Sequence, residues 1–307
     1  MGDHQPFAPT PATPQTTRTA AGETVRIRPL ASAADGKACV ELQRHVWGWD
    51  QADIVPATLL HIVEYVGGLA AGAFDQHGTL LGFVFGVSGV RDGELAHWSH
   101  MLGVRETARN LGIGRLLKEY QRTTLAARAI TRIYWSFDPL MAKNAYFNLN
   151  RLGANVVDYV PDMYGSTDSP LHLGLPTDRL VVRLDTPGPA ATAVRGAAHD
   201  RLPILSAFPR QSDVRVSAGE RAPDSALIEI PTDILGVVKR SRDEAATWRF
   251  AVREHVQWAL SRGYAISGVE LNAEAGRCFY LVSRAPSDST GAATSTAPSR
   301  AVHVSPA

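Results

Sequence analysis

Apolar positions in the first 185 residues change period repeatedly, from the alternation of a strand to the 3.6-residue spacing of a helix. Short segments rich in glycine, proline and aspartate separate these stretches, as expected between regular elements. The pattern predicts strand 25–30, helices 32–47 and 56–66, strands 69–75, 79–87 and 96–104, helix 113–127, strand 130–137, helix 138–152, and strands 156–164 and 179–185.

The later part of the chain predicts a second, smaller group of elements. Strand 226–231 comes first, then a helix with the capping box Ser241-x-x-Glu244 that ends at Gly263. A hairpin of 264–272 and 277–284 follows. We therefore expect a disordered tail over 1–24, a domain over 25–186, a linker over 187–200, an α+β lobe over 201–284 and a second disordered tail over 285–307.

The stretch from His97 to Arg128 combines a strand, a glycine loop and a helix, and the rest of the chain is arranged around it. Such a loop directs free backbone N–H groups and the positive end of a helix dipole to one point, where a pyrophosphate can bind. Gly112 and Gly114 lack Cβ, so their backbone can approach a ligand closely. The loop has neither a Gly-x-Gly-x-x-Gly motif nor a P-loop Lys-Ser/Thr. An ordinary strand-to-helix turn without a ligand is the alternative interpretation.

The pattern Arg-x-x-Gly-x-Gly at 109–114, flanked by a strand and a helix, resembles the coenzyme A signature of the GNAT superfamily of N-acyltransferases. The order of elements over 25–185 is also similar to the topology of that superfamily. The segments Phe-Asp-Pro-Leu (137–140) and Gly-Leu-Pro-Thr-Asp-Arg (174–179) are similar to a bacterial branch of it. The resemblance implies an α/β (α+β) fold: a GNAT-like mixed, mostly antiparallel sheet with splayed central strands, followed here by a smaller C-terminal α+β lobe.

In this superfamily pantetheine pairs with the end of the central strand, and the pyrophosphate binds at the glycine loop. The resemblance therefore implies acetyl-CoA, or another acyl-CoA, as co-substrate, and no metal. A solvent-exposed loop arginine is the alternative role for the first residue of the motif. The residues assigned to the coenzyme are Leu102, Gly103, Val104, Arg109, Asn110, Leu111, Gly112, Ile113, Gly114 and Asn144.

Direct attack of an amine on a thioester needs a base for the ammonium proton and an acid for the leaving thiolate. The superfamily often has a Glu near the position of Trp98 and a Tyr at the position of Leu149, and this chain has neither. Strand alternation would place His100 on the face of Trp98, Leu102 and Val104, and an imidazole suits a base near neutral pH. Tyr146, one helical turn before Leu149, is the candidate acid. A structural histidine and a core tyrosine are the alternatives.

Other polar groups are candidates for an acceptor pocket. Tyr164, Asp178 and Arg179 belong to the region where the last two strands of the family admit substrate. Arg249 and Arg253 share one helix face and could bind an anionic group, although we expect them to be exposed to solvent.

The bulk composition narrows the classes of function. A net charge of +1 and 20% charged residues give no electrostatic case for binding nucleic acid or an anionic membrane. No apolar run approaches the roughly 18 residues of a spanning helix, and the N-terminus lacks the apolar core of a signal peptide. Cys39 and Cys278 are far apart and suggest neither a metal site nor a disulfide framework, so a reducing cytoplasm is expected.

We therefore expect a cytoplasmic N-acetyltransferase that acts on a small amine or amino acid, with no nucleic-acid or membrane partner, and we allow for a homodimer. One alternative is a noncatalytic acyl-CoA-binding or regulatory module. Another is a binding protein whose C-terminal lobe mediates assembly.

Overall fold

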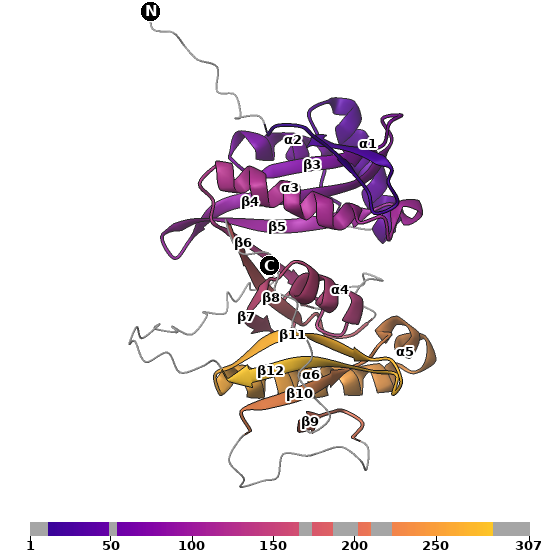
Figure 1. Cartoon of the computed structure of the whole chain (residues 1–307), viewed down its shortest axis with the longest axis vertical. Helices are drawn as coiled ribbons and strands as arrows, with labels where there is room; N and C mark the ends of the chain where they lie inside the picture. Colours follow the sequence, from indigo (N-terminus) through magenta and orange to yellow (C-terminus); the bar gives the residue numbers. More distant parts are fainter. Residues whose placement is uncertain (1–11, 49–53, 166–173, 187–201, 210–222, 285–307) are drawn as a thin grey trace, which may run out of the picture.

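The computed structural model describes residues 12–48, 54–165, 174–186, 202–209 and 223–284, which form two β-sheets with flanking helices (Figure 1). In chain order the elements are β1 (Gln15–Arg18), β2 (Thr24–Pro29), α1 (Ala33–Trp47), α2 (Ala57–Tyr65), β3 (Leu69–Phe74), β4 (Leu80–Arg91), β5 (Glu94–Val104), the 3-10 turn η1 (Glu106–Ala108), α3 (Ile113–Ala127), β6 (Arg132–Phe137), α4 (Ala142–Tyr146), the π-helical turn η2 (Phe147–Arg151), β7 (Asn155–Val160), β8 (Arg179–Asp185), β9 (Ile204–Leu205), β10 (Ser225–Ile230), α5 (Ile234–Arg240), α6 (Arg242–Ser261), β11 (Tyr264–Asn272) and β12 (Arg277–Arg284).

The larger sheet has eight strands in the order β1-β2-β3-β4-β5-β6-β8-β7, and the smaller has four in the order β11-β12-β10-β9. In the larger sheet every neighbouring pair is antiparallel except β5 and β6. The predicted order of strands and helices from β2 to β8 is confirmed, and so is the predicted class, a mixed and mostly antiparallel sheet.

The helix boundaries follow local capping chemistry. Ser32 caps α1 by accepting from the backbone N–H of Asp35, whose carboxylate accepts in return from Ser32 N, which is a complete capping box. Ser241 caps α6 by accepting from the N–H of Glu244, as predicted. Gly263, with φ +75°, follows α6 in the left-handed conformation that glycine adopts without strain.

Two predictions about elements are wrong, and two elements were missed. Residues 15–18 are not a disordered tail, because they form β1 and pair with β2 from Gln15 opposite Ile27 to Arg18 opposite Thr24. The helix predicted from Asp138 begins only at Ala142, because the Asp138 carboxylate accepts from Leu140 N and closes a turn instead of capping a helix. Helix α5 and strand β9 were not predicted at all. The predicted linker 187–200 and the tail 285–307 lie outside the described residues.

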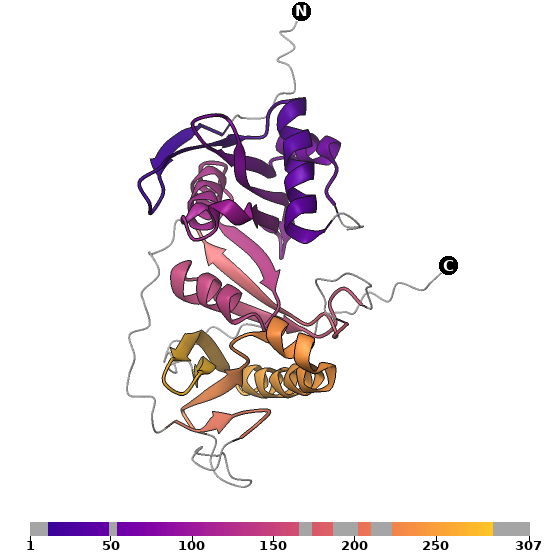
Figure 2. The same cartoon turned by 90° about the vertical axis from the view of Figure 1, so that its right-hand side faces the viewer.

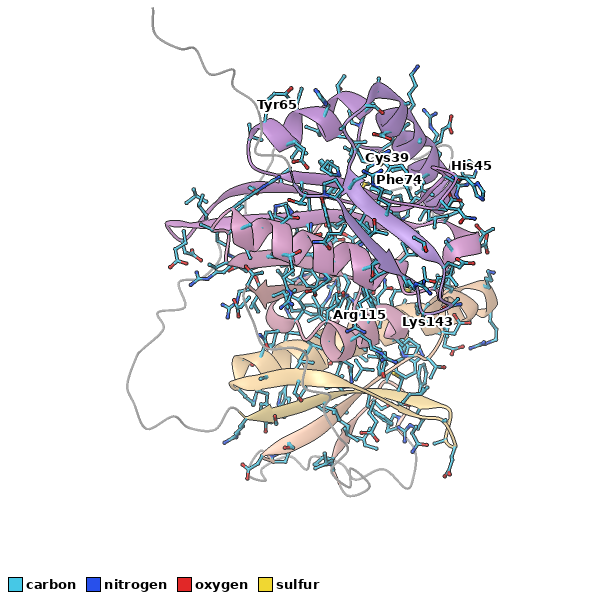
Figure 3. All side chains as sticks on the ribbon, turned by 45° about the horizontal axis from the view of Figure 1, so that its top comes forward. Cys39, His45, Tyr65, Phe74, Arg115 and Lys143 are labelled. Carbon is cyan, nitrogen blue, oxygen red and sulfur yellow. The ribbon has the colours of Figure 1, made fainter. Side chains whose placement is uncertain are left out.

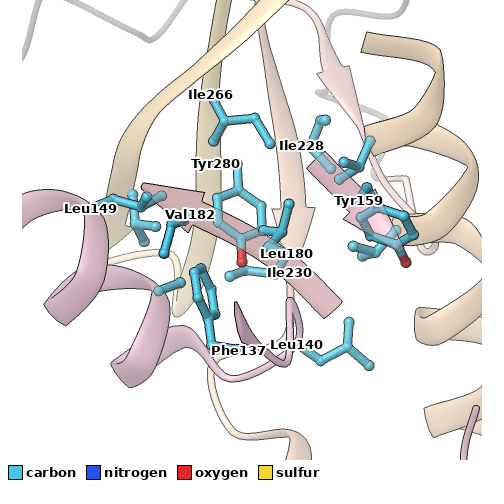
Figure 4. Packing of buried hydrophobic residues seen from close by; sticks show 14 of the residues in the cluster. Phe137, Leu140, Leu149, Tyr159, Leu180, Val182, Ile228, Ile230, Ile266 and Tyr280 are labelled. Carbon is cyan, nitrogen blue, oxygen red and sulfur yellow. The ribbon is translucent and has the colours of Figure 1, made fainter. Parts of the chain in front are cut away.

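The hydrophobic cores divide at the junction of β5 and β6. Two clusters hold buried residues from Ala12 to Tyr120, packed under α1 and α2 on one face of the sheet and under α3 on the other. A third cluster begins at Leu125 and runs to Val282, so β6, β7 and β8 share a core with the smaller sheet. Figure 4 shows this shared core around Tyr280. The C-terminal lobe is therefore not packed as a separate body.

Polar contacts also join the two sheets. The side chain of Asn150 in η2 donates to the carbonyl oxygen of Val269 in β11 (3.0 Å) and accepts from its N–H (2.9 Å). The hydroxyl of Tyr280 donates to the carbonyl oxygen of Pro139 at 2.7 Å. Figures 1 and 2 both show α4 between the larger sheet and the smaller one.

The smaller sheet repeats the topology of the end of the larger one. β6, a helix, β7 and β8 form an antiparallel unit in the order β6-β8-β7, and β10, two helices, β11 and β12 form one in the order β10-β12-β11. In each unit a left-handed glycine precedes the second strand in chain order: Gly153 precedes β7 and Gly263 precedes β11. A register shift then follows at Val157 in one unit and at Ser267 in the other.

Within the described residues, no helix has the length and apolarity needed to cross a membrane. No three His, Cys, Asp or Glu side chains in the same part of the chain lie close enough to hold a metal ion. Cys39 and Cys278 are free buried thiols, and burial raises their pKa to about 12 and about 11.

Candidate functional site

The central strands separate after a short parallel ladder. β5 pairs with β6 only where Ala96–Trp98 lie opposite Arg132–Tyr134. Residues 99–104 of β5 form no ladder with β6, although all of them except His100 stay paired with β4. We call the side of these residues that faces away from β4 the open edge of β5. Backbone N–H and C=O groups on such an edge can pair with an extended ligand. The splayed central strands predicted from the sequence are therefore confirmed.

The glycine loop has the backbone geometry of an anion site. Asn110 (φ +66°) and Gly112 (φ +83°) are left-handed, and asparagine and glycine tolerate that conformation best. Gly112 is the N-cap of α3 and, having no side chain, makes no capping bond to the first-turn N–H groups of this 15-residue helix. The carbonyl oxygen of Leu111 accepts from Ala20 N (3.2 Å), which ties the loop to the turn after β1.

The glycine loop, the open edge and η2 meet at Gly114. A Cβ placed on Gly114 would lie 3.7 Å from Leu102 Cδ2, 3.9 Å from Val104 Cγ2 and 3.8 Å from Phe147 Cζ. The structure thus brings together most of the residues that the resemblance assigned to a coenzyme. Gly103 faces the opposite side of the sheet, where a Cβ would come within 2.7 Å of Phe83 Cε1. A side chain at position 103 would therefore displace the aromatic ring beneath α1.

Exposed cationic side chains flank the glycine loop along the chain, and another lies on α4. Arg109 is 53% exposed, and its ion pair with Glu106 is long at 3.9 Å. Arg115 in the first turn of α3 and Lys143 on α4 are also exposed, and Figure 3 marks both. The sequence reasoning missed these two residues, although a cation one or two positions after a glycine loop is a readable signal. Asn144 is exposed beside Lys143, and no contact places it at the open edge.

A β-bulge changes the position predicted for His100. Phe85 pairs with Met101 and Gly86 pairs with Ser99, so His100 is the extra residue of β5. Beyond the bulge, Leu102 packs against the cluster beneath α3. The ring of His100 instead lies edge-on to the ring of Phe85, with 6.1 Å between the centroids, and Phe85 belongs to the cluster beneath α1 and α2. The prediction that His100 shares a face with Leu102 and Val104 is therefore wrong.

The candidate acid lies on an exposed part of the chain. Tyr146 is 42% exposed, and the guanidinium of Arg151 stands 5.6 Å from its ring centroid. Leu149, at the position where the family often has tyrosine, is buried in the shared core. Next to it, Asn148 accepts a hydrogen bond from Trp135 Nε1 at 3.0 Å.

A chain of buried polar groups lies beneath α3, where the β5–β6 ladder ends and the open edge begins. Lys118 Nζ donates to Ser99 Oγ (2.8 Å) and Gln121 Oε1 (3.3 Å), and Gln121 Nε2 lies 3.1 Å from His97 Nε2. Ser88 Oγ donates to the carbonyl of Gly67 and so accepts from His97 Nδ1. Burial lowers the pKa of Lys118 to about 7 and, with the nearby Lys118 and Arg128 charges, that of His97 to about 3. His97 is therefore neutral and has a structural role in this hydrogen-bonded chain.

Arg249 and Arg253 were expected to be exposed to solvent, but both form ion pairs that join α6 to the larger sheet. Arg249 is 1% exposed and donates from Nη2 to Asp138 Oδ2 at 2.6 Å. Arg253 grips Asp178 through both carboxylate oxygens, at 2.9 and 2.5 Å, and Tyr159 also donates to Asp178. These hydrogen bonds hold the pKa of Asp178 below its ordinary value in spite of burial. The expectation that Arg249 is exposed to solvent is therefore wrong.

Three polar side chains, Ser136 of β6, Tyr164 and Arg179, form a polar rim beside β6 on the face of α1 and α2. Ser136 Oγ and the Tyr164 hydroxyl are 3.3 Å apart, and the Arg179 guanidinium lies 5.1 Å from the Tyr164 ring centroid. Arg179 also approaches Asp138 at 3.9 Å. Tyr164 and Arg179 thus lie together beyond the end of the β5–β6 ladder.

Comparison with known proteins gives similarity at the level of structure. No family model and no curated protein matches the chain. Among solved structures, it is similar to the ribosomal-protein-S18-alanine N-acetyltransferase from Escherichia coli, with 15% identity over 61% of this chain and 98% of that one and a TM-score of 0.40. Aminoglycoside 6'-acetyltransferase type Ii matches with 20% identity, 54% and 99% coverage and a TM-score of 0.42. The structure of yncA from Salmonella typhimurium with its cofactor acetyl-CoA matches with 17% identity, 59% and 99% coverage and a TM-score of 0.43.

The element order, the mixed and mostly antiparallel sheet and the separation of β5 from β6 are those that the resemblance to the GNAT superfamily implied. The chain accordingly has a GNAT-like mixed sheet, followed by a smaller unit that repeats the topology of its last three strands.

Proposed function

We propose that this chain is an acyl-CoA-dependent N-acyltransferase, most simply one that transfers acetyl from acetyl-CoA to a small amine or amino acid. The observation that carries the proposal is the meeting of the open edge of β5 with the uncapped N-terminus of α3 at Gly114. Pantetheine amides would pair with the open edge, and the pyrophosphate would accept from the first-turn N–H groups of α3. Arg109 and Arg115, which flank the glycine loop along the chain, would add positive charge there.

The two faces of the sheet would then have separate tasks. The coenzyme approaches from the face of α3, where Leu102 and Val104 pack. The acceptor approaches from the face of α1 and α2, where the bulge leaves His100 exposed beside Phe85. His100 remains the candidate base, and Tyr146 remains the candidate acid. A cytoplasmic location and a homodimer also remain predictions.

Binding of acetyl-CoA tests this proposal. Gly112→Asp places a carboxylate against the expected pyrophosphate and strains a left-handed position, and we expect the affinity measured by calorimetry to fall at least tenfold. Gly78→Asp is the matched control, because Gly78 has φ +81° and, like Gly112, open space around a Cβ, but lies in the β3–β4 turn. Equal affinity of both variants for acetyl-CoA would exclude the assigned pyrophosphate site.

The noncatalytic alternative rests on the burial of Leu149 where the family often has its acid. Release of free thiol from acetyl-CoA in the presence of a panel of amines separates the two functions. A chain that binds acetyl-CoA and releases no thiol with any amine would be a binding module.

A further inference from the structure

A hollow of about 180 Å³ lies on the α1 and α2 face of the sheet, where β4, β5 and β6 run side by side. The register places Gly89 opposite Ala96, Val87 opposite Trp98, and Trp98 opposite Tyr134. Residues that are paired across a ladder point to the same face, so these five positions line one surface. The hollow exists because Gly89 and Ala96 bring almost no side chain to its floor. A Cβ on Gly89 would meet no atom within 4 Å.

The size and lining of the hollow fit a flat apolar group. An apolar cavity of roughly 150 Å³ accommodates a benzene-sized molecule, whereas drug-sized ligands need roughly 300–1,000 Å³. The walls are the aromatic side chains of Trp98 and Tyr134 and the side chain of Val87. The Arg91 guanidinium lies 4.6 Å from the Tyr134 ring centroid and extends that wall as a second flat surface. The volume of the hollow is therefore enough for one apolar group of a ligand and too small for a whole coenzyme.

Its position relates the hollow to the proposed reaction. Trp98 is the last residue of β5 that pairs with β6, and the open edge begins at the next residue. The bulge at His100 follows two residues after Trp98, which is about 7 Å along a strand. An amine on a short linker from a group in the hollow would therefore lie on the face of His100, at the start of the open edge.

We propose that this hollow is the subsite for the acceptor's side chain, and that the acceptor is a primary amine carrying a compact aromatic or apolar group of about benzene size. The inference rests on the proposed function. In the step it serves, the amine nitrogen forms a bond to the acyl carbon and the carbon–sulfur bond breaks. The thiolate leaves with the electron pair of that bond, and the amine gives up a proton to His100 or to solvent.

The test compares two amines on two variants, with acetyl-CoA as donor and thiol release as readout. We expect the wild-type chain to acetylate phenethylamine with a higher kcat/KM than ethylamine. Gly89→Val fills the floor and should lower kcat/KM for phenethylamine by on the order of 10- to 100-fold, with little change for ethylamine. Leu95→Ile is the matched control, because Leu95 directly precedes Ala96 on β5, is 51% exposed and is not among the residues that line the hollow.

Gly89→Val should fold, since the position is extended, has open space and favours a β-branched residue. Should its melting temperature fall instead, Trp98→Ala replaces it by removing a wall, with the same expected loss of preference for phenethylamine. Equal use of the two amines by the wild-type chain, or an unchanged ratio in the filled variant, would overturn the subsite while acyl transfer stands. Absence of thiol release with every amine would overturn the transferase itself and the subsite with it.

Discussion

Lys118 is a buried cation without a carboxylate among its hydrogen-bond partners, and this makes the stability of the fold depend on alkaline pH. Its side chain donates to Ser99 Oγ and Gln121 Oε1 and lies 4.0 Å from the centroid of the Trp135 ring. The residue is 5% exposed, and burial lowers its pKa from 10.5 to about 7. At neutral pH the native chain therefore keeps this ammonium only at a cost that the unfolded chain does not have.

The sign and size of the effect follow from linkage. Between pH 7 and pH 10.5 the unfolded chain binds a proton at Lys118 that the native chain has lost, so the free energy of unfolding rises with pH across that window. Each unit of pKa difference corresponds to about 1.4 kcal/mol, so the whole window contributes on the order of 4 to 5 kcal/mol. Below pH 7 both states carry the proton, and the full penalty is present.

Lys118→Met isolates this contribution, since methionine fills similar space without a charge. The difference in unfolding free energy between variant and wild type should favour the variant most at pH 6. It should fall by about 1.4 kcal/mol per pH unit above pH 7. Urea unfolding at pH 6 to 9.5 measures it, and titration of ¹³C-labelled lysine side chains reports the pKa directly. A free-energy difference that does not change with pH, with Lys118 titrating near 10.5, would refute the reasoning.

Three further predictions concern other side chains. The pKa of His97 is lowered to about 3, so below pH 6.5 the unfolded chain binds a proton that the native chain does not bind. In urea titrations, the unfolding free energy of His97→Gln should therefore fall less than that of the wild type between pH 6.5 and pH 4. His100→Ala should lower kcat by on the order of 10² to 10⁴ while acetyl-CoA affinity and Tm stay unchanged; a folded variant with wild-type kcat removes His100 from the mechanism. Asp178→Asn should cost roughly 3–5 kcal/mol, because Arg253 and Tyr159 lose a buried charged partner, and a Tm within one degree of wild type would contradict this.

Short-range patterns predicted the regular strands well. Residues 179–185 were predicted as a strand, and β8 spans Arg179–Asp185; both arms of the last hairpin also have the predicted bounds. The alternation of apolar and polar side chains depends only on neighbouring residues, so it can be recognised without knowing the partner strand. The turn Gly-x-Gly-helix was likewise visible, because glycine at a left-handed position has a local cause.

Features that depend on distant partners were missed. The bulge at His100 cannot be counted from alternation, because it is defined by the pairing of β4 with β5. Strand β1 has only four residues, and it becomes a strand through its pairing with β2. Arg249 appeared as a surface cation because its burial follows from the packing of α6 against Asp138, more than a hundred residues away in sequence.

The division of the hydrophobic cores between β5 and β6 also bears on how the chain opens. Two regions that each bury most of their own core, joined by one short parallel ladder and by side-chain contacts such as Lys118 over the Trp135 ring, are expected to behave as separate cooperative units in native-state hydrogen exchange. The glycine loop and the open edge of β5 belong to the first unit, and the rim of β6 with α4 belongs to the second. A ligand that contacts both units would slow exchange in both at once. In the proposed transferase, the separation of β5 from β6 would then depend on the orientation of these two units relative to each other.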